Sequence, residues 1–151
     1  MTRRRILVVE DGNEYVEVFR RLVPWPGGIE LLHAQDAAAA WRVIAEAPVE
    51  AVFLDVVFDR TPPEKLTGDL DQLLERFCGD RSRAFEHLAR NQGFYIADAL
   101  APLLPAGVRV VLACDFSSEP ARLAALREKL PTLNGVADGT TAKEVLAKLL
   151  G

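Results

Sequence analysis

Three acidic residues directly follow two apolar segments of the chain. Glu10 and Asp11 come after residues 6–9, and Asp55 comes after residues 51–54. Carboxylates held close together repel one another, so such a trio needs either raised pKa values or a bound cation. Hard divalent ions, of which Mg2+ is the best suited here, prefer oxygen ligands of this kind. With a metal bound, Asp55 could act as a nucleophile toward phosphorus.

The segments that must position these acids are expected to be strands of a parallel sheet. Strands are predicted at 6–9, 29–34, 51–54, 108–113 and 135–137. Helices are predicted at 13–23, from 36 to about 47, at 93–104, at 120–130 and from 141 onward. Strands that are apolar throughout are buried on both faces, as in a parallel sheet covered by helices. The fold class is therefore α/β, and sites in such sheets form beyond the carboxyl ends of the strands.

Several helix signals are specific enough to check. Asp36 is expected to be an N-cap, Pro120 to occupy the first turn of its helix, and Thr141 to open a capping box with Glu144. Pro102 must kink or shorten the helix that it falls in. The apolar residues expected to point inward from that helix are Ile96, Leu100, Leu103 and Leu104.

Composition limits the classes of function. The 151 residues, half of them apolar, fit one domain spanning 1–151. A net charge of -4 argues against binding to nucleic acid or anionic lipid, and Arg3-Arg4-Arg5 is expected to be a solvated strand entry. No segment predicts a signal peptide or a bilayer-spanning helix, so a cytoplasmic protein is expected.

The cysteines and histidines are expected to have structural roles. Cys78 and Cys114 lie far apart without the spacing of a zinc site, which predicts two reduced, packed thiols. His33 and His87 lack ligand spacing and are expected to be packed or surface residues. No Gly-rich phosphate loop is present, and residues 55–57 lack the second Asp of haloacid-dehalogenase-like phosphatases, so we do not expect an enzyme.

The run Ile6-Leu7-Val8-Val9-Glu10-Asp11, followed by Val52-Phe53-Leu54-Asp55, resembles the receiver domains of two-component response regulators. The resemblance implies a CheY-like, flavodoxin-like fold with a doubly wound five-stranded parallel sheet. It also implies that Asp55 is the phosphoacceptor in a phosphorelay. The metal ligands, for Mg2+, would be Glu10, Asp11, Asp55 and the backbone carbonyl of Val57.

Two positions depart from the receiver pattern. Receivers carry a Thr or Ser hydroxyl at the end of the fourth strand, where this chain has Ala113. They carry a Lys at the end of the fifth strand, where this chain reads Gly135-Val136-Ala137-Asp138-Gly139. The aromatic residue that receivers place on the fifth strand is also missing. These departures weaken the step from family to phosphorylation.

A third departure is a predicted helical insertion, about residues 59–92, between the third strand and the helix opened by Gly93. Leu70, Leu73, Leu74 and Phe77 follow a helical spacing that Gly79 can end, and residues 83–90 predict a second helix. The insertion could be a lid, could supply a missing cation through Lys65 or Arg60, or could present a partner surface. The simpler alternative is that it covers the flank of the sheet.

Two functions therefore remain open. A third interpretation is that the three acids are ordinary polar residues where strands meet solvent. The first function is a stand-alone receiver that accepts a phosphoryl group on Asp55 from a histidine kinase or phosphotransfer protein. The second is a phosphorylation-independent pseudo-receiver that acts as a protein-protein interaction module. Because the sequence carries no output domain, both functions require contact with another protein.

Overall fold

The structure is a computed structural model that describes residues 4–22, 25–137 and 140–151. Within these residues, five strands form one parallel sheet in the order β2-β1-β3-β4-β5. The strands are β1 (Arg4–Val9), β2 (Ile29–Ala34), β3 (Ala51–Leu54), β4 (Arg109–Leu112) and β5 (Asn134–Gly135). The predicted α/β class, the flavodoxin-like topology and all five strands are confirmed.

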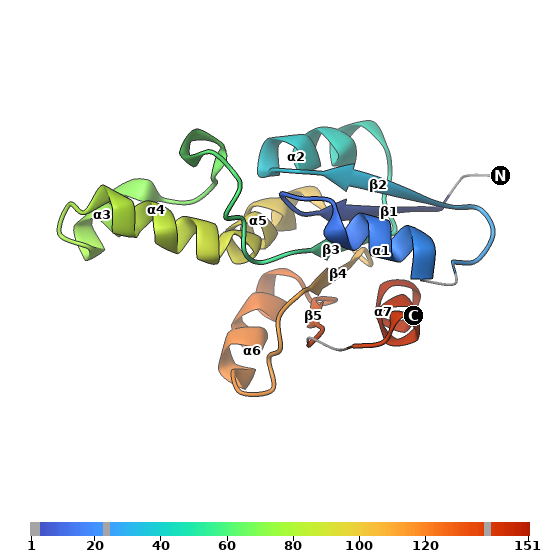
Figure 1. Cartoon of the computed structure of the whole chain (residues 1–151). Coiled ribbons are helices and arrows are strands. Elements are labelled where there is room, and N and C mark those ends of the chain that lie inside the picture. The colour runs from blue at the N-terminus through green and yellow to red at the C-terminus, as the bar shows by residue number, and fades with distance from the viewer. Residues whose placement is uncertain (1–3, 23–24, 138–139) are drawn as a thin grey trace.

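Helices follow the strands along the chain, as Figure 1 shows. They are α1 (Glu14–Leu22), α2 (Ala37–Glu46), α3 (Leu70–Arg76), α4 (Arg81–Arg90), α5 (Gln92–Leu100), α6 (Pro120–Lys129) and α7 (Ala142–Leu150). Short 3-10 helices cover Pro63–Lys65 and Ala101–Leu103. Among the helices that the structure describes, none combines the length and apolar character needed to cross a bilayer.

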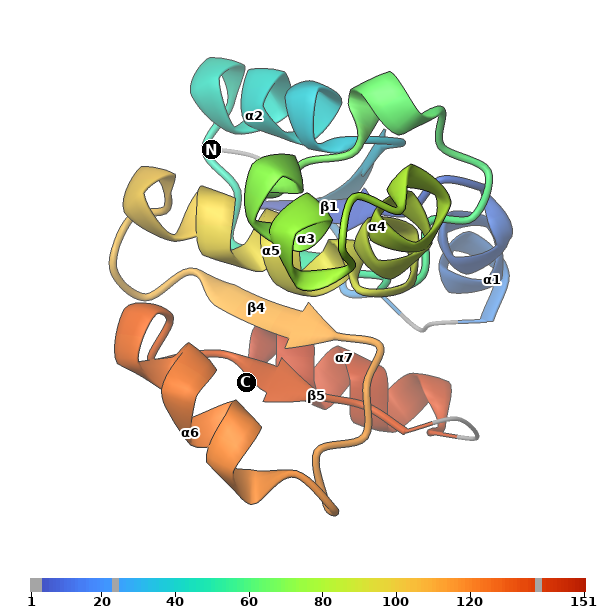
Figure 2. The same ribbon diagram turned by 90° about the vertical axis from the view of Figure 1, so that its left-hand side faces the viewer.

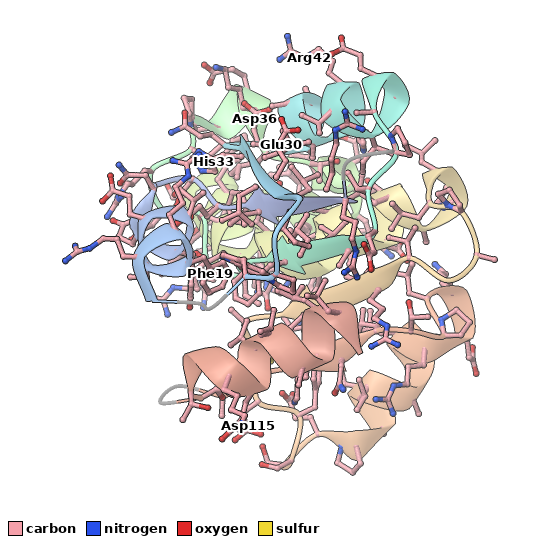
Figure 3. The ribbon with its side chains drawn as sticks, turned by 90° about the vertical axis from the view of Figure 1, so that its right-hand side faces the viewer. Phe19, Glu30, His33, Asp36, Arg42 and Asp115 are labelled. Atoms are coloured by element: carbon pink, nitrogen blue, oxygen red, sulfur yellow. The ribbon has the colours of Figure 1, made fainter. Side chains whose placement is uncertain are left out.

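The sheet is buried on both faces because helices cover it from two sides (Figure 2). Leu7 and Val9 of β1 belong to the cluster in which α2, α5 and α6 pack, whereas Ile6 and Val8 belong to the cluster with α1 and α7. Alternate side chains of a strand point to opposite faces, so an all-apolar strand feeds both clusters. Phe19 of α1, labelled in Figure 3, packs edge-on against Phe53 of β3. This packing holds α1 against β3.

The predicted capping residues are confirmed where the structure describes them. Asp36 accepts a hydrogen bond from Ala39 N at 2.8 Å, and Thr141 accepts one from Glu144 N at 3.2 Å. Pro120 opens α6. Val23, predicted as the last residue of the first helix, lies outside the described residues, as do Arg3 and Asp138.

Three sequence expectations are wrong in detail. Leu103 is 51% exposed and does not point inward, because Pro102 ends α5 and residues 101–103 continue as a 3-10 helix with a different angular spacing. The fifth strand begins one residue earlier than expected and is short, at Asn134–Gly135. Cys78 is a free but exposed thiol, because it lies in the turn after α3 and not on a packed face of a helix or strand.

The two helices predicted within residues 59–92 are confirmed as α3 and α4, which lie beyond the carboxyl ends of the strands (Figure 1). They form an apolar cluster of their own around Leu73, Ala84 and Leu88. The turn between them uses left-handed backbone at Cys78 and Gly79, as expected for a glycine that ends a helix. Gln92 ties the preceding loop to α5, because its side-chain amide accepts from Thr67 N and donates to Thr67 O.

Candidate functional site

All four residues predicted to form the site line one depression at the carboxyl ends of β1 and β3. Its volume is about 360 Å³. The described residues that line it are Glu10, Asp11, Glu14, Tyr15, Asp55, Val57, Asp59 and Arg60. The structure therefore brings the predicted trio together with two further acids and one arginine. These side chains come from the ends of two adjacent parallel strands, from the start of α1 and from the loop after β3.

Glu10 is almost completely buried, and its carboxylate caps α1. Its two oxygens accept hydrogen bonds from Tyr15 N at 3.0 Å and Val16 N at 2.8 Å. Carboxylates are favourable at helix N-termini because they satisfy free N–H groups and complement the helix dipole. His33 of β2, labelled in Figure 3, places Nε2 4.0 Å from Glu10 Oε2. Glu10 thus holds α1 against the strand end, a role that the sequence analysis did not predict.

The carboxyl group of Asp55 has a raised pKa. Burial raises the pKa of its carboxyl to about 6, the hydrogen bond from Val56 N opposes that rise, and the charges of Asp11, Glu10 and Glu14 add to it. The Val56 N–H donates to Asp55 Oδ1 over 2.8 Å. A carboxyl group with this pKa is largely ionised at pH 7, so it can act as a nucleophile, and a nearby cation would favour the ionised form further.

Gly93 allows the backbone after β3 to pass close to α5. A Cβ atom at Gly93 would overlap the Asp55 carbonyl oxygen and would lie 2.7 Å from Val56 Cα. Gly93 N donates to Val56 O at 3.0 Å, which fixes the chain immediately after Asp55. The glycine that opens this helix is therefore required by a close backbone approach, which places Asp55 at the depression.

Asp11 and Glu14 are both bound by Arg60. The backbone N–H of Arg60 donates to Asp11 Oδ2 at 2.7 Å, and Arg60 Nη2 pairs with Glu14 Oε1 at 2.5 Å. This pairing lowers the pKa of Glu14 and raises that of Arg60. A side chain at Gly12 would overlap Glu14 Oε2 and Arg60 Nη1, so Gly12 leaves the room in which the pair forms. Lys65, the other cation considered from sequence, is not among the described residues that line the depression.

The donor set fits a hard divalent ion by chemistry. Asp11, Asp55 and Val57 line one depression, and burial, with a smaller contribution from the neighbouring negative charges, raises the pKa of Asp55. Glu10 already uses both oxygens to cap α1. Across the described residues, no group of three or more His, Cys, Asp or Glu side chains is placed closely enough to hold a metal ion. That Glu10, Asp11, Asp55 and the Val57 carbonyl bind a metal stays a prediction.

The ends of β4 and β5 carry different chemistry. Ala113 is half-buried, and its backbone N–H donates to Leu54 O at 3.0 Å, so a methyl group stands at the end of β4. Beyond β5, Val136 is buried and apolar. Lys148 of α7 donates to Gly135 O and lines a separate depression with Asp115 of the β4–α6 loop. Asp115 is labelled in Figure 3.

The sequence analysis missed three lining residues: Glu14, Tyr15 and Asp59. The short link between Asp11 and the predicted first helix was a signal for Glu14 and Tyr15. Both residues begin α1, soon after the first strand ends. Tyr15 also packs against Phe53 at a ring distance of 4.9 Å. No sequence pattern indicated Asp59 as a site residue, because it lies in a loop whose course depends on the burial of Phe58.

No protein-family model and no curated protein sequence matches the chain. Solved structures do match. A response regulator receiver domain protein (CheY-like) from Methanospirillum hungatei is 13% identical, with a TM-score of 0.58, over 97% of this chain and 90% of that chain. The chain folds as a response regulator receiver domain. The receiver domain of NtrX from Brucella abortus is 18% identical, with a TM-score of 0.60, over 94% of this chain and 92% of that chain.

A third matching structure contains a modified residue and bound groups. It is a response regulator protein from Burkholderia pseudomallei with a phosphorylated aspartic acid, a calcium ion and citrate. It is 14% identical, with a TM-score of 0.58, and the match covers 97% of this chain and 66% of that chain. These matches span nearly all of this chain, so they do not set residues 59–92 apart. That this segment is an insertion into the receiver fold stays a prediction.

Proposed function

We propose that the chain is a receiver domain of two-component signalling that accepts a phosphoryl group on Asp55 with the help of Mg2+. The observation that carries the proposal is the convergence of Asp55, Glu10 and Asp11 on one depression of a receiver fold. The donor would be a histidine kinase or phosphotransfer protein in the cytoplasm. The signal would pass on by protein contact, without nucleic acid or membrane.

The reaction assigned to Asp55 is transfer of a phosphoryl group between two proteins. A carboxylate oxygen of Asp55 attacks phosphorus, and the bond from phosphorus to the donor's imidazole nitrogen breaks as the new P–O bond forms. The nitrogen keeps the bonding electron pair and takes up a proton, which leaves a neutral histidine and an aspartyl phosphate. The pKa of about 6 leaves Asp55 mostly ionised at neutral pH, as this attack requires.

Asp11, Asp55 and the Val57 carbonyl are the groups proposed to hold Mg2+. When bound, the ion would neutralise charge on the phosphoryl oxygens during transfer. Glu10 would support the site without binding the ion, because both of its carboxylate oxygens accept hydrogen bonds from the N-terminus of α1. The matched Burkholderia structure contains a phosphorylated aspartic acid together with a divalent cation, which supports this combination for the fold.

The proposal is tested by incubating the chain with acetyl phosphate and measuring its intact mass. The expected result is the gain of one phosphoryl group that requires Mg2+ and is absent from Asp55→Asn. Asp59→Asn is the matched control, because it removes another acid from the same depression and should still be modified. A mass gain that persists in Asp55→Asn, or one that does not need Mg2+, would contradict the assignment.

The second function, a phosphorylation-independent pseudo-receiver, is favoured by one specific observation. Ala113 places a methyl group where a phosphoryl-responsive hydroxyl would be expected. In that case the protein would bind a partner through α3 and α4, which lie beyond the strand ends (Figure 2). The same mass measurement separates the two functions, because a wild-type chain that stays unmodified at millimolar Mg2+ supports the second.

A further inference from the structure

Arg60 is the one cationic side chain among the described residues that line the acidic depression. Five carboxylates line it as well: Glu10, Asp11, Glu14, Asp55 and Asp59. Phosphorylation would convert the ionised Asp55, which carries one negative charge, into an aspartyl phosphate that carries about two, a net gain of about one negative charge. Even a divalent metal ion would leave the depression strongly anionic. Any further neutralisation by the lining residues themselves must come from Arg60.

The main chain of Arg60 is held in place independently of its side chain. Its N–H donates to Asp11 Oδ2 at 2.7 Å. Two residues earlier, the fully buried Phe58 donates its N–H to the carbonyl of Ala89 in α4 at 2.8 Å. These bonds hold the base of the Arg60 side chain at the mouth of the depression. Removal of the guanidinium should therefore leave the loop where it is.

The ion pair that holds the Arg60 guanidinium is exposed to solvent. Its partner is Glu14, and the two side chains are 60% and 59% exposed. Ion pairs this exposed contribute little to stability, because water and salt compete with them. The charge of Glu14 contributes to the raised pKa of Asp55, so Glu14 lies within electrostatic range of Asp55. Gly12 leaves open the space in which the pair sits.

We infer that Arg60 is a phosphoryl-binding residue whose guanidinium leaves Glu14 and pairs with the phosphoryl oxygens once Asp55 is modified. The inference rests on the proposed function. A guanidinium suits this exchange because its planar donors match phosphoryl oxygens as well as they match a carboxylate, and a dianion attracts it more strongly. Arg60 would thus supply, from the loop after β3, a cation for the phosphoryl group that receivers take from a Lys at the end of their fifth strand.

The test uses beryllium fluoride with Mg2+ as a phosphoryl analogue and measures its affinity for the full-length chain by 19F NMR. Arg60→Ala should bind about tenfold more weakly, the factor carried by one charge-assisted contact. Arg60→Lys should recover part of the loss. Lys65→Ala is the matched control, since it removes an exposed cation from the same segment outside the depression, and it should bind like the wild type.

A double-mutant cycle with Glu14→Gln tests the exchange itself. Glu14→Gln should tighten binding in the wild type by releasing Arg60, and should do so less in the Arg60→Ala background. Unchanged affinity in Arg60→Ala, or an equal loss in Lys65→Ala, would overturn the inference and leave the proposed function standing. If beryllium fluoride fails to bind to the wild type, the result contradicts both the proposed function and this inference.

Discussion

The two halves of the sheet end in contrasting chemistry. At the carboxyl ends of β1 and β3, five carboxylates and an arginine line one depression, and Asp55 has a pKa of about 6. At the ends of β4 and β5, Ala113 offers a methyl group and Val136 is buried and apolar. The difference teaches that the acids on which the proposed phosphorylation depends lie at one half of the sheet, whereas the described residues named at the other half are apolar. Under the proposed function, other residues would carry the response.

The acidic half costs stability, and the protein offsets that cost locally. Glu10 is buried but accepts two backbone N–H groups, which is how a buried carboxylate becomes tolerable. Asp55 has less compensation, since a single hydrogen bond from Val56 N opposes its burial and the neighbouring charges. Electrostatic destabilisation of this kind is typical of functional sites, where a reactive group is retained although it lowers stability.

The largest effect on the acidic half is expected from Gly93→Ala. The added Cβ would overlap the Asp55 carbonyl oxygen, so the backbone after β3 must shift. We expect a loss of about 3 kcal/mol in the free energy of unfolding. Urea denaturation measures it, with Gly27→Ala as the control because a Cβ there meets nothing within 4 Å. Equal stability of the two variants would show that the close approach is not rigid.

Glu10→Ala should have the next largest effect. The substitution leaves Tyr15 N and Val16 N without their carboxylate partner at the start of α1, and we expect a loss of about 2 kcal/mol. Glu46→Ala, at an exposed position that ends α2, should change the unfolding free energy by under about 0.5 kcal/mol. If Glu10→Ala unfolds like wild type, Glu10 does not hold α1.

Asp55→Asn should make the protein more stable, and the gain should depend on pH. Because the folded pKa, about 6, lies above the ordinary value of 3.8, ionisation of Asp55 destabilises the fold as pH rises between these values. After a discount for partial exposure, we expect a gain of about 1 to 2 kcal/mol above pH 6.5 that vanishes below pH 4. Urea denaturation of both proteins at about five pH values between 4 and 8 measures this gain. A gain independent of pH would contradict the titration of Asp55.

The smallest effect on stability, and the sharpest test of the comparison, is expected from Ala113→Thr. It places a hydroxyl at the end of β4 and should change the unfolding free energy by under about 1 kcal/mol at this half-buried position. Ala113→Val is the control, since it has the same shape without the hydroxyl. Only the Thr variant should extend beryllium fluoride-induced amide shifts into residues 113–137. Equal maps for both variants would show that the missing hydroxyl is not what separates the halves.

Much of the fold could be predicted from the sequence because its signals are local. The apolar runs of β1 and β3 and the cap residues Asp36 and Thr141 each act within a few positions. The exposure of Leu103 could not be predicted from helical spacing, because Pro102 changes the helix type just before it. The limits of β5 were also uncertain, since a two-residue strand is defined by its pairing with β4 more than by its own residues.

The convergence of the site was predictable, but its internal contacts were not. Parallel strand ends meet at one edge, which is why Glu10, Asp11 and Asp55 could be placed together. That Glu10 caps α1 depends on the angle at which the helix leaves the strand. That Arg60, and not Lys65, lines the depression depends on the bonds that anchor the loop to Asp11 and to α4. The contact between Arg60 and Asp11 joins residues 49 positions apart, and no local pattern encodes it.

The most direct test of the central claim, a Mg2+-dependent phosphoacceptor site at the ends of β1 and β3, is an amide-shift map of the 15N-labelled chain. Spectra are recorded in Mg2+ with and without beryllium fluoride, for wild type and Asp55→Asn. The predicted result is that the largest wild-type shifts fall on Asp11 and on residues 55–60, with none in Asp55→Asn. A wild-type spectrum that does not change at millimolar Mg2+, or identical shifts in both proteins, would contradict the claim.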